Sequence, residues 1–181
     1  MERKSGLLVC LLGGAAVSLA CGCWWFETEA QLQHIYDQSE EAFVGQAIAA
    51  IAPHEPGRNR RFLGYDVLLR VTSRKKGLVR RDTVLVLQEE SNCARPFVKD
   101  DTVNVFAHVI RHVQPLLQPG QEHYSYFDEQ RQSFYRSGGA AVVKRDQQWA
   151  GRFPAITTNQ CISFTNRHRL VPAFFRAKQD Q

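Results

Sequence analysis

Four of the five cysteines follow an N-terminal segment with the pattern of a secretory signal peptide. Residues 1–20 start with a short basic stretch, and Gly6–Ala20 is an uncharged, largely apolar run that ends with the small residues Ser18 and Ala20 before Cys21. This length suits a signal peptide, whereas a membrane span needs roughly 20 apolar residues. The pattern predicts a signal peptide over 1–20 and export to an oxidising compartment, either periplasmic or extracellular.

The cysteines of the predicted mature chain are Cys21, Cys23, Cys93 and Cys161. An even number of cysteines in an exported chain indicates two disulfides. A bond between Cys21 and Cys23 would need too tight a ring. One of them is therefore expected to pair with Cys93 and the other with Cys161, in either combination. Each bond would close a long loop and stabilise the fold by about 4–5 kcal/mol in the chain-entropy model. The paired C-x-x-C spacing of a structural zinc site is absent.

A lipoprotein is the alternative interpretation of the same junction. A lipid on Cys21 would consume its thiol and leave three cysteines, an odd number. Ser18 stands three residues before Cys21, where a lipoprotein signal normally has Leu. Both observations favour ordinary cleavage, and membrane attachment is expected only if Cys21 is lipidated.

Hydrophobic periodicity divides the mature chain into short elements. The patterns predict a helix over 28–38 capped by Thr28, strands over 42–51, 65–73, 83–88 and 101–110, a closing segment over 156–164 and a terminal helix over 170–178. A basic turn over 73–82 joins the second and third strands. Residues 114–155 are mixed in character and are predicted to be an insertion or a long loop, with a strand of a late hairpin over 140–146.

About five short strands without a βαβ rhythm predict an all-β domain over 21–181, flanked by short helices. A small, closed or partly open barrel suits this pattern. An immunoglobulin-like sandwich is the alternative, but it normally places its cysteines on facing strands rather than at the N-terminus.

Several segments together resemble the netrin-like domains, and most closely the N-terminal domain of the tissue inhibitors of metalloproteinases. They are the C-x-C start, "AFVGQA", "YDVLLRVTSRKKG", "TVLVLQEESNC" and the closing "QC". The resemblance covers Cys21–His108 and Thr157–Phe164. It implies a five-stranded OB-fold Greek-key barrel, and it implies the disulfide pairs Cys21–Cys93 and Cys23–Cys161.

The resemblance also implies a function for the first mature residue, Cys21. In this family the α-amino nitrogen and the backbone carbonyl of that residue chelate the catalytic zinc of a protease and displace its water. Catalytic zinc keeps an open position for such ligands, and an α-amine with a pKa near 7.7–8.0 is partly neutral at physiological pH. The next residue, Gly22, would face the specificity pocket without a side chain. The implied partner is a zinc metalloprotease, and no metal or other cofactor of the chain's own is expected.

A basic stretch offers a second candidate interface. Between Arg58 and Arg81 there are nine Arg or Lys residues and a single acid, Asp66. The candidate interface residues are Trp24, Trp25, Arg74, Lys75 and Lys76. The alternative function is therefore an extracellular or cell-envelope binding module for a protein or polyanion, without inhibitory activity. Nucleic acid is not an expected partner of an exported chain.

No arrangement of residues indicates an enzyme. His108 and His112 lie four apart, but their segment has a strand pattern, and this spacing would suit a metal only on a helix. The acid pairs Glu89–Glu90 and Asp100–Asp101 lie in predicted loops and are expected to be solvated.

Overall fold

A computed structural model describes residues 28–52, 61–77, 80–90, 94–116, 124–158, 163–165 and 170–178. The helices are α1 (Glu29–Gln38), α2 (Ala140–Ala150) and α3 (Val171–Ala177). The strands are β1 (Glu41–Ala50), β2 (Phe62–Gly64), β3 (Val67–Lys76), β4 (Thr83–Leu87), β5 (Phe97–Val98), β6 (Thr102–Ile110), β7 (His112–Pro115), β8 (Tyr126–Asp128), β9 (Ser133–Arg136), β10 (Ala155–Thr157) and β11 (Ser163–Thr165). The chain is mostly β with short helices, as its patterns predict.

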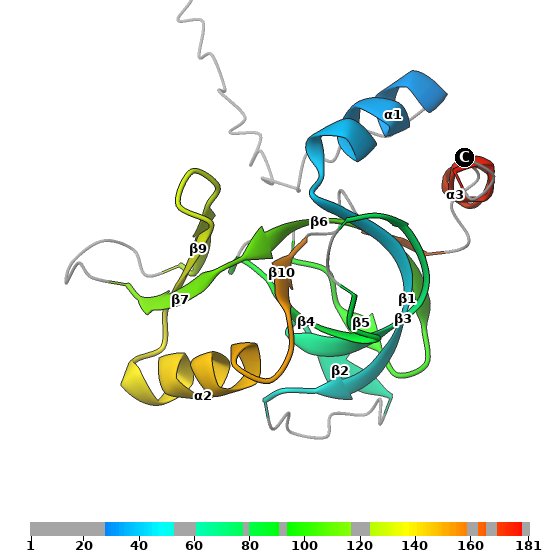
Figure 1. Cartoon of the computed structure of the whole chain (residues 1–181). Coiled ribbons are helices and arrows are strands. Elements are labelled where there is room, and N and C mark those ends of the chain that lie inside the picture. The colour runs from blue at the N-terminus through cyan, green and yellow to red at the C-terminus, as the bar shows by residue number, and fades with distance from the viewer. Residues whose placement is uncertain are drawn as a thin grey trace, which may run out of the picture.

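Five strands form a closed barrel in the order β1-β3-β4-β10-β6, and β6 pairs with β1 to close it (Figure 1). The neighbouring strands are antiparallel except β4 and β10, which run parallel. The last barrel strand, β10, therefore lies between β4 and β6. Strand β11 continues the sheet beyond β6, and β2 pairs separately with β5.

The barrel interior is filled by apolar side chains from alternate positions of its strands, as period-two strands require. The fully buried members include two large rings, Phe43 on β1 and Phe97 on β5. The remaining members of this core are mainly valines, with Ala47, Leu69, Ala107 and Ile156. The β-branched residues that favour strands thus also supply much of the packing.

Strand β3 is longer than its alternating pattern predicts. It begins at Val67 rather than at Tyr65 and runs through the basic residues to Lys76. The turn begins only at Gly77, which has φ = +117°. The positive φ favours glycine, and a Cβ atom there would also displace the Glu41 carboxylate. Lysine and arginine are compatible with a strand whose side chains are only partly buried.

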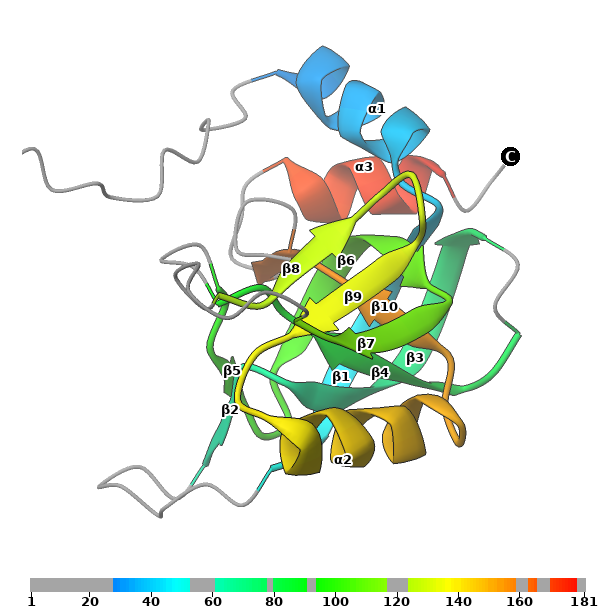
Figure 2. The same cartoon turned by 90° about the vertical axis from the view of Figure 1, so that its left-hand side faces the viewer.

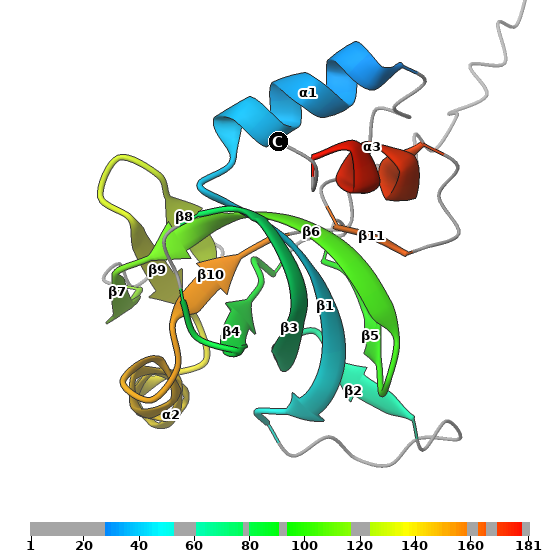
Figure 3. The same ribbon diagram turned by 45° about the vertical axis from the view of Figure 1, so that its right-hand side comes forward.

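Helices α1 and α3 pack together against β6 (Figure 3). Thr28 and Gln31 form a reciprocal capping box at the start of α1, which satisfies backbone donors of the first turn. The fully buried Leu32 joins a cluster with Phe106, Phe174 and Phe175. The predicted helix with its Thr28 cap and the predicted terminal helix are both confirmed.

The region over 114–155 is predicted to be an insertion or a long loop, with a strand over 140–146. The prediction of this strand is wrong. Residues 140–146 begin helix α2, which suits a segment with several good helix formers such as Ala, Lys and Arg. Gly139, with φ = +84°, precedes the helix. Strands β7, β9 and β8 form a three-stranded sheet beside α2 (Figure 2). We call β7, β8, β9 and α2 the insertion layer, because in the sequence they are inserted between barrel strands β6 and β10.

Candidate functional site

The predicted N-terminal site lies outside the described residues. This applies to the signal peptide, to Cys21 and Gly22, to Trp24 and Trp25, and to the disulfide pairs Cys21–Cys93 and Cys23–Cys161. All of these stay predictions.

The predicted interface residues Arg74, Lys75 and Lys76 lie at the end of β3, beside the C-terminal end of α1. The Lys76 Nζ donates hydrogen bonds to the carbonyl oxygens of Tyr36, at 2.7 Å, and Asp37, at 2.9 Å. It also lies 5.2 Å from the centre of the Tyr36 ring. A cation at this end complements the helix dipole and the free carbonyls of the last turn. Lys76 therefore binds α1 to the barrel.

Arg74 and Lys75 also make contacts within the chain. The Arg74 guanidinium lies 4.0 Å from the buried Glu41 carboxylate and donates to the carbonyl of Arg81 at 3.1 Å. The Tyr36 hydroxyl donates to the carbonyl of Lys75 at 2.9 Å. The pKa of that hydroxyl is raised, mainly by burial and to a smaller extent by the negative charge of Asp37. A polyanion would have to compete with these contacts.

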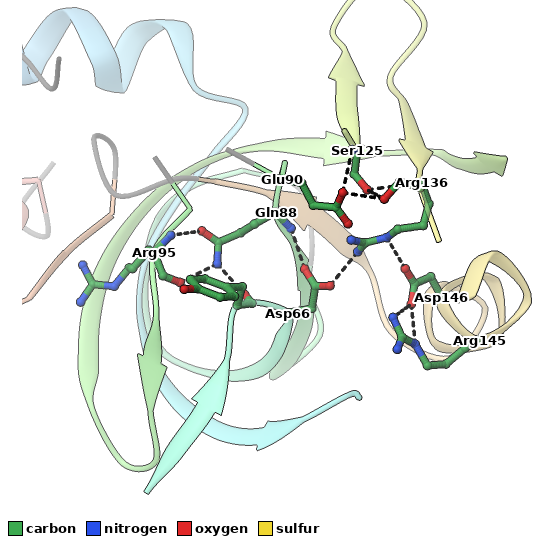
Figure 4. Close-up of polar contacts among 10 residues, drawn as sticks. Asp66, Gln88, Glu90, Arg95, Ser125, Arg136, Arg145 and Asp146 are labelled. Atoms are coloured by element: carbon green, nitrogen blue, oxygen red, sulfur yellow. Dashed lines mark hydrogen bonds and ion pairs between the residues drawn. The ribbon is translucent and has the colours of Figure 1, made fainter. Parts of the chain in front are cut away.

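A chain of four charged side chains, of which Arg136 and Asp146 are buried, joins the barrel to the insertion layer (Figure 4). Arg136 on β9 is only 4% exposed, and its guanidinium contacts two carboxylates: Asp66 at 2.8 Å and Asp146 at 2.6 Å. Asp146 on α2 is fully buried and also contacts Arg145 at 2.7 Å. The order is Asp66, Arg136, Asp146, Arg145, so negative and positive charges alternate. We call these four residues the charge chain.

Hydrogen bonds from Gln88, the residue after β4, hold the barrel end of the charge chain. The backbone N–H of Gln88 donates to Asp66 at 2.9 Å. The Gln88 side chain donates to the carbonyls of Tyr65 and Arg95, and its oxygen accepts from the Arg95 backbone N–H at 2.6 Å. Gln88 thus links the segment of Tyr65 and Asp66 to the segment at Arg95.

Glu89 and Glu90 contact the insertion layer, whereas the sequence predicted a solvated acid pair. Glu89 accepts a hydrogen bond from the Phe127 backbone at 2.9 Å. Glu90 accepts from the Ser137 hydroxyl at 2.6 Å, and Ser137 in turn contacts Ser125. The two carboxylates therefore bind the β8–β9 hairpin to the end of β4.

The charge chain is suited to attachment rather than to catalysis. Burial raises the pKa of the Asp66 carboxyl, while the Arg136 cation opposes that rise. Each charge in the chain has a partner of opposite sign, which is the condition under which buried ions persist. Sequence reasoning missed this cluster. The one signal was Asp66, the only acid in the basic stretch from Arg58 to Arg81.

The insertion layer has an exposed tyrosine on β8 and a cleft at the other edge of its sheet. Tyr126 is 45% exposed and stacks on Tyr135, with ring centres 4.9 Å apart and an angle of 18°. The cleft, of about 450 Å³, lies between β7 and α2. Its lining residues are Arg111, His112, Val113, Gln114, Gln147, Ala150 and Gly151.

The two candidate histidines lie on strands, as predicted, and do not meet. His108 on β6 stacks on Phe127, and its Nδ1 lies 3.8 Å from a Glu129 oxygen. His112 on β7 lines the cleft.

Within the described ranges, no group of three or more His, Cys, Asp or Glu residues is arranged to hold a metal. The helices of the described chain are all too short or too polar to cross a membrane. Comparisons with protein-family models, with curated proteins and with solved structures return no match.

Proposed function

We propose that the chain is an exported OB-fold module that inhibits a zinc metalloprotease through the amine and carbonyl of Cys21. The strand order of the barrel supports the OB-fold. Three successive barrel strands, β1, β3 and β4, form a meander, β6 returns beside β1, and β10 enters between β4 and β6 parallel to β4. This Greek-key connection in a five-stranded barrel is the arrangement that the resemblance implies.

The anchoring of the segments next to the cysteines supports a rigid N-terminus. Arg95 follows Cys93 by two residues and is bonded to Gln88. Ser163 follows Cys161 by two residues and pairs with Val105 on β6. The proposed disulfides would therefore attach the first residues to two fixed parts of the barrel. A terminus held in this way loses less entropy when it binds zinc.

Gly22 sets the expected selectivity. Its lack of a side chain removes contacts in the specificity pocket of the protease, so binding would rest on zinc chelation and on the surrounding surface. We expect an inhibitor of broad range and modest affinity, since an unfilled pocket contributes little discrimination.

The test compares two forms of the mature protein against a panel of zinc metalloproteases. One form begins with a free Cys21, and the other carries a single extra alanine that places the amine in a peptide bond. We expect inhibition by the first form only. Equal inhibition by both forms, or inhibition by neither, contradicts the proposal. Mass spectrometry of the exported protein identifies the N-terminus, and a diacylglycerol on Cys21 would contradict the Cys21–Cys93 pair.

A binding module without inhibitory activity is the second candidate. The observation that favours it is the insertion layer, because an extra sheet with exposed tyrosines and an adjoining cleft is unnecessary for chelation by the N-terminus. The contacts of Arg74 and Lys76 within the chain favour a surface other than the end of β3 for this function.

A further inference from the structure

The exposed large hydrophobic side chains of the described residues all flank one segment of the chain. They are Tyr65, Tyr124 and Tyr126, with exposures of 50%, 60% and 45%. The segment is 88–95, which follows β4 and contains Cys93. Hydrogen bonds at Gln88 and Glu90 connect it to the tyrosines on its two sides. We call Tyr65, Tyr124 and Tyr126 the tyrosine surface.

Tyr65 lies on one side of the segment. The Gln88 side chain donates to the carbonyls of Tyr65 and Arg95, and its oxygen accepts from the Arg95 backbone N–H at 2.6 Å (Figure 4). Gln88 is only 2% exposed, so these bonds are shielded from water and hold Tyr65 next to Arg95. The Tyr65 ring contacts Phe62 edge to face, with ring centres 6.1 Å apart.

Tyr124 and Tyr126 lie on the other side of the segment, on either side of the buried Ser125 in the sequence. The Glu90 backbone N–H donates to the Ser125 carbonyl at 3.1 Å, and the Ser125 N–H donates to the Glu90 carboxylate at 3.4 Å (Figure 4). The ring of Tyr126 stacks on Tyr135, with centres 4.9 Å apart. The start of β8 is therefore attached directly to the segment that contains Cys93.

This segment contains the cysteine to which the proposed function attaches the N-terminus. Cys93 stands three residues after Glu90 and two before Arg95 in the sequence. Three residues span at most about 11 Å, and two at most about 7 Å. A disulfide joins Cα atoms less than about 7 Å apart. With the pair Cys21–Cys93, Cys21 therefore lies within about 18 Å of Glu90 and about 14 Å of Arg95. A standard interface patch, about 30 Å across, is large enough to include Cys21 and the tyrosine surface.

We propose that the tyrosine surface is a second contact for the same zinc metalloprotease, an inference that rests on the proposed function. Tyrosine is enriched at the energetic hot spots of protein interfaces. Its large ring supplies apolar area, and its hydroxyl can form a hydrogen bond. Rings already supported by aromatic neighbours lose little freedom on binding. Because Gly22 places no side chain in the specificity pocket, the tyrosine surface supplies the discrimination between proteases.

The arrangement favours a protein partner over a sugar or a polyanion. The rings stand on separate parts of the chain, on both sides of the segment, which suits a broad partner. A small ligand needs a hollow, and the described cleft lies at the other edge of the insertion sheet, between β7 and α2. A polyanion would meet the carboxylates of Glu89 and Glu90, which lie between Tyr65 and β8.

The test measures inhibition constants of the intact mature protein with a free Cys21, against the protease of the panel that it inhibits most strongly. Tyr65→Ala and Tyr124→Ala should each raise the constant at least about fivefold, and the double variant more than either. Gln148→Ala is the control, an exposed residue of α2 beyond β7, and should stay within about twofold. Thermal unfolding checks that each variant is folded, and Tyr126→Ala replaces Tyr124→Ala if the latter disturbs the hairpin.

The outcomes separate this inference from zinc chelation. If the variants inhibit as the native protein does, and the free amine is still required, the tyrosine surface is contradicted and chelation stands. If neither N-terminal form inhibits any protease, both proposals are contradicted. If both N-terminal forms bind the protease equally and tyrosine substitution weakens both, the surface belongs to a binding module without chelation, which also contradicts the inference.

Discussion

The barrel is covered on two sides by elements that are attached in different ways. Helices α1 and α3 contact it through an apolar cluster of Leu32, Phe106, Phe174 and Phe175. The insertion layer also buries apolar groups, but buried ions link it to the barrel in addition. Apolar contacts weaken gradually as atoms are removed, and they do not depend on pH. A buried ion chain is strongly destabilised when its shared cation is lost, because the carboxylates left behind keep their desolvation penalty.

Arg136→Met should have the largest effect, a loss of about 3–5 kcal/mol in the free energy of unfolding at pH 7. The change leaves the buried carboxylates of Asp66 and Asp146 without their shared cation. The loss should be smaller at pH 5, since burial raises the pKa of the Asp66 carboxyl, which can then take up a proton more readily. Urea denaturation at both pH values measures this. The control Lys144→Met removes an exposed cation from α2 and should cost less than about 0.5 kcal/mol.

Leu32→Ala tests the apolar side and should cost about 2–3 kcal/mol. Leu32 is fully buried, but α1 lies at the surface and can shift to reduce the cavity. The loss should be equal at pH 5 and pH 7 in the same denaturation experiment. A clear pH dependence of this loss would contradict the claim that the helices α1 and α3 are attached to the barrel through apolar contacts.

Lys76→Met should cost about 1 kcal/mol, since it removes the cation at the carbonyls of Tyr36 and Asp37. Hydrogen exchange should show faster opening of α1, with the barrel strands unchanged. Arg70→Met, at an exposed cation earlier on β3, is the control and should leave exchange in α1 as it is. Equal protection of α1 in both variants would show that Lys76 does not hold the helix.

Asp66→Asn should have the smallest effect on stability at pH 7, within about 1 kcal/mol. Burial raises the pKa of Asp66 above its ordinary value of 3.8, so the folded state binds this proton more tightly than the unfolded state does. The contribution of Asp66 to stability therefore falls as the pH rises from about 3.8 through the folded pKa, and it stays low above that. The Asn side chain does not ionise, so the free energy of unfolding no longer falls with pH at this position. Its amide oxygen can still accept the hydrogen bond from the Gln88 backbone N–H. A loss as large as that of Arg136→Met would refute the assigned sign.

The barrel strands and terminal helices could be predicted because each carries its own local pattern. Thr28 caps a helix that has apolar residues at helical spacing, and β6 has a run of β-branched residues. The insertion layer could not be predicted in the same way, because β8 has only three residues and α2 starts without a side-chain cap. Strands this short acquire their structure from their neighbours in the sheet.

The charge chain depends on partners that are distant in the sequence. Arg136 lies 70 positions from Asp66 and 10 from Asp146. A single sequence contains no local signal for such pairs, since every member is a common surface residue type. The candidate interface at Arg74 and Lys76 illustrates the same limit. Their charge could be read directly, but their contacts with Glu41 and the end of α1 could not.

The parallel pairing of β4 with β10 has a consequence for when the chain can fold. The barrel lacks a strand until residues 155–157 enter between β4 and β6, although β1 begins at residue 41. Contacts between such distant segments make folding slow. A chain that is still being synthesised has no means of closing this barrel until residues 155–157 have emerged. A protein that must cross a membrane unfolded would gain from that delay, because its barrel stays open until a strand more than a hundred positions beyond the start of β1 has been made.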